Sequence, residues 1–185
     1  AKIEFEDDIE IIPSPKELGY RSRARWHIDR NKKAIGYFAR DSHDVIDIAK
    51  CPKLTPELEL AYEDIRSTTE WEMLWSDESE IEAATGDKGT SIVSEETTGH
   101  AELSFALEDD NYVYSAETFF QANKFLIKEL IDAAIDGSAG QTAFDLYCGV
   151  GLFALPLARR FENVAAVEEN SVAVQFANKN VANAG

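Results

Sequence analysis

Hydrophobic and polar positions alternate along the first part of the chain. Alternating segments cover residues 24–28, 34–39 and 45–48, and polar stretches separate them. Since successive side chains of a β-strand point to opposite faces, this pattern predicts strands with one buried and one solvated face. The polar stretches between them favour turns, so we expect an antiparallel meander from Tyr20 to about Ile48.

A helix is predicted after this meander. Thr55 belongs to the residue types that cap helices, Pro56 suits the first helical position, and Glu57 is an acid in the first turn. We therefore expect a helix that begins after Thr55 and runs to about Arg66.

The following region carries weaker signals. A strand is predicted over residues 70–75. Residues 76–100 are rich in Ser, Thr, Gly, Asp and Glu, a composition that favours turns, weak strands and a mobile excursion. Residues 101–107 alternate again, so we expect this segment to return to the sheet.

Helical periodicity and buried strands mark the last part of the chain. Apolar residues over 122–135 form one helical face. A buried strand, a glycine turn and a helix start follow over residues 142–158, and a second buried strand spans residues 164–168. Ser171 can cap a last helix over residues 172–182.

This order of elements predicts an α/β fold, α+β overall, in two unequal parts. Residues 1–111 would form a β-rich region with one helix. Residues 112–185 would form the first half of a Rossmann-like domain, because a strand-helix-strand crossover places two parallel strands side by side.

The turn between the two predicted parallel strands is the leading candidate for a binding site. Gly149 and Gly151 allow a sharp bend and a close backbone approach to a ligand, and the next helix would direct free N–H groups at the same point. Glu168 ends the second strand, where a carboxylate can accept hydrogen bonds from ribose hydroxyls. Spacing alone leaves NAD, a flavin and S-adenosylmethionine open as the ligand.

Four segments, in a fixed order, carry a family resemblance. They are Gly-Tyr-Arg-Ser-Arg-Ala-Arg at 19–25, the segment at 42–54 with its Cys-Pro pair, Ser-Ala-Glu-Thr-Phe-Phe-Gln-Ala-Asn at 115–123, and Asp-Leu-Tyr-Cys-Gly-Val-Gly-Leu-Phe at 145–153. Together they resemble the RNA uracil-5-methyltransferases over nearly the whole chain. The resemblance implies a class I enzyme that uses S-adenosylmethionine to form 5-methyluridine in rRNA or tRNA.

The resemblance also implies a set of cofactor-binding residues. Gln121 matches the family's cofactor-side glutamine. Tyr147 matches an aromatic position that borders the cofactor, although by itself it could equally be a core residue at a strand end. Asp145 would orient the turn through backbone N–H groups, which we favour, or reach the cofactor itself. Glu168 would bind the ribose, its alternative being a solvent-exposed acid. The full set is Gln121, Asp145, Tyr147, Gly149, Gly151 and Glu168.

The resemblance places the chemical step outside this chain. In the family, a cysteine thiolate adds to C6 of uracil, which makes C5 nucleophilic, and a base later removes the C5 proton. Both residues lie downstream of Gly185 in the family pattern, so we expect a fragment with no catalytic residue and no activity of its own. Cys148 is rejected as the nucleophile, because it lies in the cofactor turn, where a small residue usually packs against the helix.

Cys51 has a different counterpart. In iron-sulfur members of the family, a cysteine before proline at this place supplies the fourth ligand of a [4Fe–4S] cluster, and an upstream cysteine cluster supplies the other three. The sequence has two cysteines, Cys51 and Cys148. The resemblance therefore implies a cluster only in a longer parent protein, and in this chain we expect a free, buried thiol.

The charge distribution bears on RNA binding. A net charge of −17 argues against a uniformly nucleic-acid-binding surface. Basic residues are nevertheless concentrated between positions 21 and 33. The resemblance makes Arg21, Arg23 and Arg25 candidate RNA-binding residues, whereas their period-two spacing alone slightly favours the solvated face of an ordinary strand.

Composition narrows the setting. No apolar run approaches the roughly 18 residues that cross a bilayer, and two cysteines offer no disulfide framework, so we expect no membrane partner and a cytoplasmic location. Two other functions stay open: a noncatalytic Rossmann-like binding module and an NAD-dependent oxidoreductase. The second parallel strand would lack a neighbour on one side, which predicts self-association through an exposed sheet edge.

Overall fold

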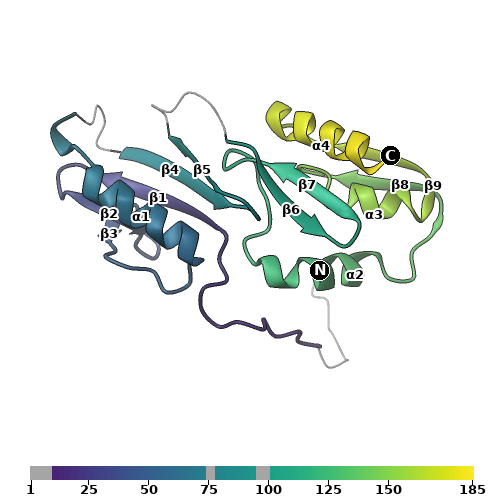
Figure 1. Cartoon of the computed structure of the whole chain (residues 1–185), viewed down its shortest axis with the longest axis horizontal. Helices are drawn as coiled ribbons and strands as arrows, with labels where there is room; N and C mark the ends of the chain where they lie inside the picture. The colour runs from purple at the N-terminus through teal and green to yellow at the C-terminus, as the bar shows by residue number, and fades with distance from the viewer. Residues whose placement is uncertain (1–9, 74–77, 95–100) are drawn as a thin grey trace.

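A five-stranded antiparallel sheet forms the first unit of the protein (Figure 1). The computed structural model describes residues 10–73, 78–94 and 101–185. The strand order is β3-β2-β1-β4-β5, with bounds β1 Arg23–Asp29, β2 Ala34–Phe38, β3 Val45–Asp47, β4 Glu78–Thr85 and β5 Thr90–Ser94. The predicted meander is confirmed as β1 to β3.

The alternation along β1 creates the core of this unit. Residues 24, 26 and 28 are buried and pack with the helix α1 (Pro56–Thr68), which covers one face of the sheet. The rings of Trp26 and Tyr62 lie 4.7 Å apart between centroids. Thr55 is the N-cap residue of α1, so the predicted helix start is confirmed.

Of the turns and weak strands predicted over residues 76–100, the strands are confirmed as β4 and β5, which are regular members of the sheet. Positions 76, 77 and 95–100 of the predicted mobile excursion lie outside the described residues. β4 lies inside the sheet, paired with β1 over seven residues and with β5 on its other side. Its acids Glu80 and Glu82 suggest a solvated segment, yet they form ion pairs with Arg25 and Arg23 of β1. Local composition does not show these pairs, because they join residues far apart in the sequence.

Two other predictions need correction. Residues Trp71–Met73 form the 3₁₀ helix η1 where a strand is expected, and positions 74 and 75 lie outside the described residues. β6 (Leu103–Leu107) is a strand, but it pairs with β7 (Asp110–Tyr114) in a separate two-stranded sheet instead of returning to the large one. This hairpin runs across position 111, and the division of the chain there stays a prediction.

The second half contains the predicted parallel crossover. Its elements are η2 Lys124–Leu126, α2 Ile127–Ile135, β8 Gly140–Leu146, α3 Ala154–Ala158, β9 Phe161–Val167 and α4 Ser171–Ala184. β8 and β9 pair in parallel, which confirms the α/β fold class at this point. α2 starts later than expected, because the Asn123 side chain accepts from the Phe125 N–H and caps a 3₁₀ turn. α4 is capped by Asn170 and not by Ser171.

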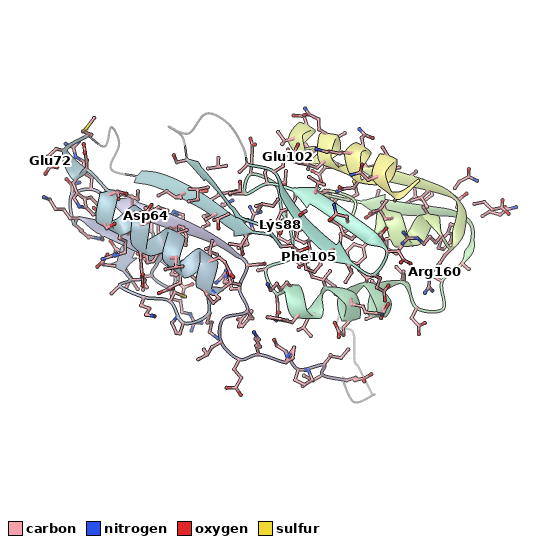
Figure 2. All side chains as sticks on the ribbon, in the orientation of Figure 1. Asp64, Glu72, Lys88, Glu102, Phe105 and Arg160 are labelled. Carbon is pink, nitrogen blue, oxygen red and sulfur yellow. The ribbon has the colours of Figure 1, made fainter. Side chains whose placement is uncertain are left out.

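A second hydrophobic core joins the hairpin, α2, the glycine turn and α4. Phe120 is central to it: its ring stacks on Tyr114 at 4.2 Å and meets the edge of Phe105 at 5.7 Å between centroids. Phe105 belongs to β6 and lies on the side of the hairpin nearer α2 in Figure 2. Within the described ranges, no helix has both the length and the apolar character that a membrane crossing requires.

Candidate cofactor site

The glycine turn leaves β8 through three residues with left-handed backbone angles. The φ angles are 62° at Tyr147, 55° at Gly149 and 88° at Gly151. The Cys148 N–H donates to the Val167 carbonyl at 3.0 Å and ties the turn to the end of β9. The Tyr147 side chain is 87% exposed, so it is not a core aromatic and is open to contact a ligand.

Glycine is required at position 151 by its backbone angle more than by lack of space. A Cβ there would lie 3.7 Å from the Cβ of Ala177 in α4, which is an ordinary contact. A non-glycine residue at a φ of 88° is strained whatever the space. The sharp bend therefore depends on this glycine.

Glu168 connects the turn to the helix that follows β9. Its Oε2 accepts from the Gly149 N–H at 2.8 Å, and its Oε1 accepts from the Asn170 N–H at 2.8 Å. These bonds, the one from Asn170 first, hold the pKa of Glu168 below its usual value against the opposing effect of partial burial. The carboxylate is thus ionised and fixed, and each oxygen keeps a lone pair for a hydroxyl donor.

Asp145 lies buried beneath the turn. Burial raises its pKa, and a hydrogen bond from the Ala154 backbone N–H at the start of α3 partly offsets that rise. This contact supports the role of orienting the turn. Among the described residues, its Oδ2 has no hydrogen-bond partner, so this atom retains an acceptor.

Asn180 of α4 is a site residue that the sequence prediction missed. It is 1% exposed. Its Nδ2 donates to the carbonyls of Val150 at 2.9 Å and Val113 at 3.0 Å, and its Oδ1 accepts from the Val113 N–H at 2.7 Å. The side chain thus ties the residue between the two glycines to β7. The available signal was an asparagine three residues after Ala177 on the inner face of the predicted helix.

Gln121 is only indirectly connected with the turn. The carbonyl oxygen of Phe119 lies 3.8 Å from where a Cβ on Gly149 would be, so this segment runs beside the turn. The residue Gln121 itself lines a groove of about 390 Å³ along α2, together with Asn123, Leu126 and Leu130. The structure therefore brings together the turn, Asp145 and Glu168. Gln121 is not in this group: the nearest residue of its segment that contacts the turn is Phe119, two positions earlier.

Comparison with known proteins identifies the family of this site. The family model for tRNA (Uracil-5-)-methyltransferase matches residues 67–185. The chain belongs to this family. The glycine turn, Glu168 and Asn180 all lie within the matched range.

Curated relatives and a solved structure agree with this assignment. The 23S rRNA (uracil(1939)-C(5))-methyltransferase RlmD of Marinomonas posidonica is 28% identical over 88% of this chain and 46% of its own length. The tRNA (uracil(54)-C(5))-methyltransferase of Pyrococcus horikoshii is 24% identical over 94% of this chain and 54% of its own. The crystal structure of the Pyrococcus abyssi tRNA (uracil-54, C5)-methyltransferase in complex with S-adenosyl-L-homocysteine superposes with a TM-score of 0.73 at 22% identity, covering 95% of this chain and 55% of that one. The chain spans about half the length of these relatives.

Cys148, in this uracil-5-methyltransferase turn, is a packing residue. It is 7% exposed. Burial raises its pKa, and the nearby carboxylates of Asp145 and Glu168 raise it further. A thiol with a raised pKa is a poor nucleophile at neutral pH, which agrees with its rejection as the catalytic cysteine.

Cys51 is free and half-buried, not fully buried as expected. Its backbone N–H donates to the Glu59 carboxylate, with distances of 3.2 and 3.3 Å to the two oxygens. Among the described residues, no three histidine, cysteine or acidic side chains cluster as a metal site would require. These residues do not make a cluster site, and a role of Cys51 as a fourth ligand stays a prediction.

The three arginines of the basic strand differ in their surroundings. Arg25 is 56% exposed and forms an ion pair with Glu80 at 3.0 Å between Nε and Oε1. Arg23 is only 16% exposed, and its Nη2 bonds Glu82 at 2.9 Å. Arg21 is exposed, and its Nε donates to the Arg23 carbonyl at 3.1 Å. Exposure therefore favours Arg21 and Arg25 over Arg23 as RNA ligands.

Proposed function

We propose that this chain carries the S-adenosylmethionine-binding turn and part of the RNA-side region of an RNA uracil-5-methyltransferase. The observation that best supports this proposal is the Glu168 carboxylate, which two backbone N–H groups hold in ionised form beside the glycine turn. A fixed carboxylate at a strand tip suits the two ribose hydroxyls of a nucleoside cofactor. The chemistry that S-adenosylmethionine supplies is an electrophilic methyl group.

The other site residues have distinct proposed roles. Tyr147, with its exposed ring, would border the cofactor. Asp145 would hold the start of α3 through its hydrogen bond with the Ala154 N–H. Gln121 would approach from the Phe119 side of the turn, after a rotation of its side chain out of the groove along α2. Gly149 and Gly151 would permit the close backbone approach.

The substrate of the whole protein would be a uridine of rRNA or tRNA, as the names of the relatives suggest. Arg21 and Arg25 are the proposed contacts from this chain, and the nucleophilic cysteine and the general base would come from outside it. An RNA substrate suits a cytoplasmic location. Residues 1–111 would form the RNA-side region and residues 112–185 the cofactor side.

Calorimetry with S-adenosylhomocysteine and NAD tests the cofactor. We expect S-adenosylhomocysteine to bind and NAD to bind more weakly or not at all. Glu168→Gln should weaken S-adenosylhomocysteine binding by about tenfold, because the amide loses the charge that favours hydroxyl donors. Glu169→Gln is the matched control on the neighbouring acid and should leave the affinity unchanged. Tighter binding of NAD would refute the proposal.

Self-association through the β8–β9 pair is a second proposal. Phe144, Leu146 and Val167 are 56% to 70% exposed on one face of these two strands, and an exposed apolar face favours contact with another copy. Among the described residues β8 and β9 form a two-stranded sheet, so the edges of this pair are also open to pairing. Light scattering coupled to size-exclusion chromatography should show a dimer at high concentration. A monomer at all concentrations would rule it out.

A further inference from the structure

Arg23 is fastened to the segment that precedes α2. Its Nη1 donates to the carbonyl of Thr118, its Nη2 bonds Glu82, and its guanidinium carbon lies 6.0 Å from the centre of the Phe119 ring. Thr118 is fully buried, and its hydroxyl donates to the Ser115 carbonyl at 3.1 Å. Arg23 thus holds the end of a closed turn.

The backbone beside Arg23 extends this attachment. The Ser22 N–H donates to the Ala122 carbonyl at 2.8 Å, and the Ser22 hydroxyl donates to the same oxygen at 3.0 Å. Arg21 forms an isolated β-bridge with Asn123. Residues 118–123, which include Gln121, are therefore bonded to residues 21–23 at both ends, through Thr118 and through Ala122 and Asn123.

The opposite side of this segment meets the cofactor turn. The Phe119 carbonyl faces Gly149, so the segment is held by Arg23 on one side and lies against the turn on the other. We infer that Arg23 is a positioning residue for the cofactor site and not an RNA ligand, an inference that rests on the proposed function. It links the five-stranded sheet to the residues around Gln121.

Arg23→Lys tests this inference while keeping the charge. A lysine can pair with Glu82, but its single ammonium cannot reproduce the fork that bonds Glu82 and the Thr118 carbonyl together. Arg66→Lys is the matched control: Arg66 of α1 bonds the Asp47 carboxylate at 2.6 Å and the Ile35 carbonyl at 3.1 Å, and neither partner belongs to residues 115–123.

Two measurements decide the outcome. Calorimetry should show on the order of tenfold weaker S-adenosylhomocysteine binding in Arg23→Lys, from the loss of a charge-assisted hydrogen bond, and unchanged binding in Arg66→Lys. Hydrogen exchange should become faster over residues 115–123 in Arg23→Lys and stay the same there in Arg66→Lys. If the unsubstituted chain binds S-adenosylhomocysteine and Arg23→Lys binds it with the same affinity, the inference is overturned.

The exchange measurement separates this inference from the proposed function. If the unsubstituted chain binds no S-adenosylhomocysteine, the proposed function fails. Hydrogen exchange alone then decides the role of Arg23. Faster exchange over residues 115–123 would then still support the positioning role, whereas unchanged exchange would refute it. Thermal unfolding of both variants confirms that each is folded at the assay temperature.

Discussion

Trp26 and Phe144 are aromatic residues on strands of two different sheets, the five-stranded sheet and the β8–β9 pair, and their surroundings contrast. Trp26 is fully buried between β1 and α1, whereas Phe144 on β8 is 70% exposed. The five-stranded sheet has a helix on one face and ion pairs between β1 and β4 on the other. The β8–β9 pair exposes apolar side chains on one face, while α3 packs against β9 and hydrogen bonds from the Cys148 and Gly149 N–H groups join the glycine turn to Val167 and Glu168. The contrast shows that burial against α1 stabilises the five-stranded sheet, whereas the β8–β9 pair leaves apolar surface in solvent and is joined to the turn by specific polar contacts.

Trp26→Ala should give the largest loss of stability. Removing a fully buried indole costs about 3–5 kcal/mol in lost burial and in the cavity left behind. Urea unfolding followed by circular dichroism measures the change. Trp71→Ala is the control, because Trp71 of η1 is only partly buried against the same core, and it should cost less.

Asn180→Leu tests the hydrogen bonds by which α4 holds β7 and the glycine turn together. The leucine would leave the Val113 N–H and two carbonyl oxygens buried without partners, at a cost of about 2–4 kcal/mol. The neighbouring Asn178 is exposed, so Asn178→Leu should be nearly neutral. Equal unfolding curves for the two variants would contradict the role assigned to Asn180.

The two carboxylates of the turn should respond oppositely to pH. The pKa of Glu168 is lowered by folding, so its stabilising effect is present above the ordinary glutamate value of about 4.3 and is lost as the pH falls through the lowered value. The pKa of Asp145 is raised, so its ionisation lowers stability as the pH rises above about 3.9.

Unfolding of two variants at pH 7 and pH 4 measures these opposite effects. At pH 7, Glu168→Gln should be less stable than the unsubstituted chain, and Asp145→Asn should be more stable than it. The Asp145→Asn difference should shrink at pH 4, close to the ordinary aspartate value, whereas the Glu168→Gln difference should shrink only partly there, because the lowered pKa of Glu168 keeps its carboxylate ionised to lower pH. Differences of the same sign for both variants would contradict the environments described for them.

Phe144→Ser should have the smallest effect on stability. Because most of the ring is already in solvent, the expected change is about 0.5 kcal/mol. The same substitution should reduce self-association in light scattering if β8 lies at the contact. A loss as large as that of Trp26→Ala would remove the contrast between the two sheets.

Local patterns predicted the elements whose signals lie within a few residues. The alternation of β1, the Thr55-Pro56 helix start and the Gly149-Gly151 turn are of this kind. The place of β4 inside the sheet was not predicted, because its acids are neutralised by arginines that lie more than fifty positions earlier in the chain. Asn180 was missed, and the burial of Arg23 was not predicted, for a related reason: an asparagine in a helix and an arginine on a strand are ordinarily solvated, and only the packed fold supplies carbonyl partners for them.

The hairpin β6–β7 has a practical consequence for dividing this protein into separately expressed pieces. A cut at the predicted boundary near residue 111 would divide β7 itself, leaving β6 in one piece and the Tyr112–Tyr114 end of β7 in the other, and would remove Leu103 and Phe105 from the core that buries them. Each piece would then expose an apolar strand without its pairing partner and tend to aggregate. A piece that begins just before Leu103 keeps the hairpin whole and carries the complete glycine turn with it.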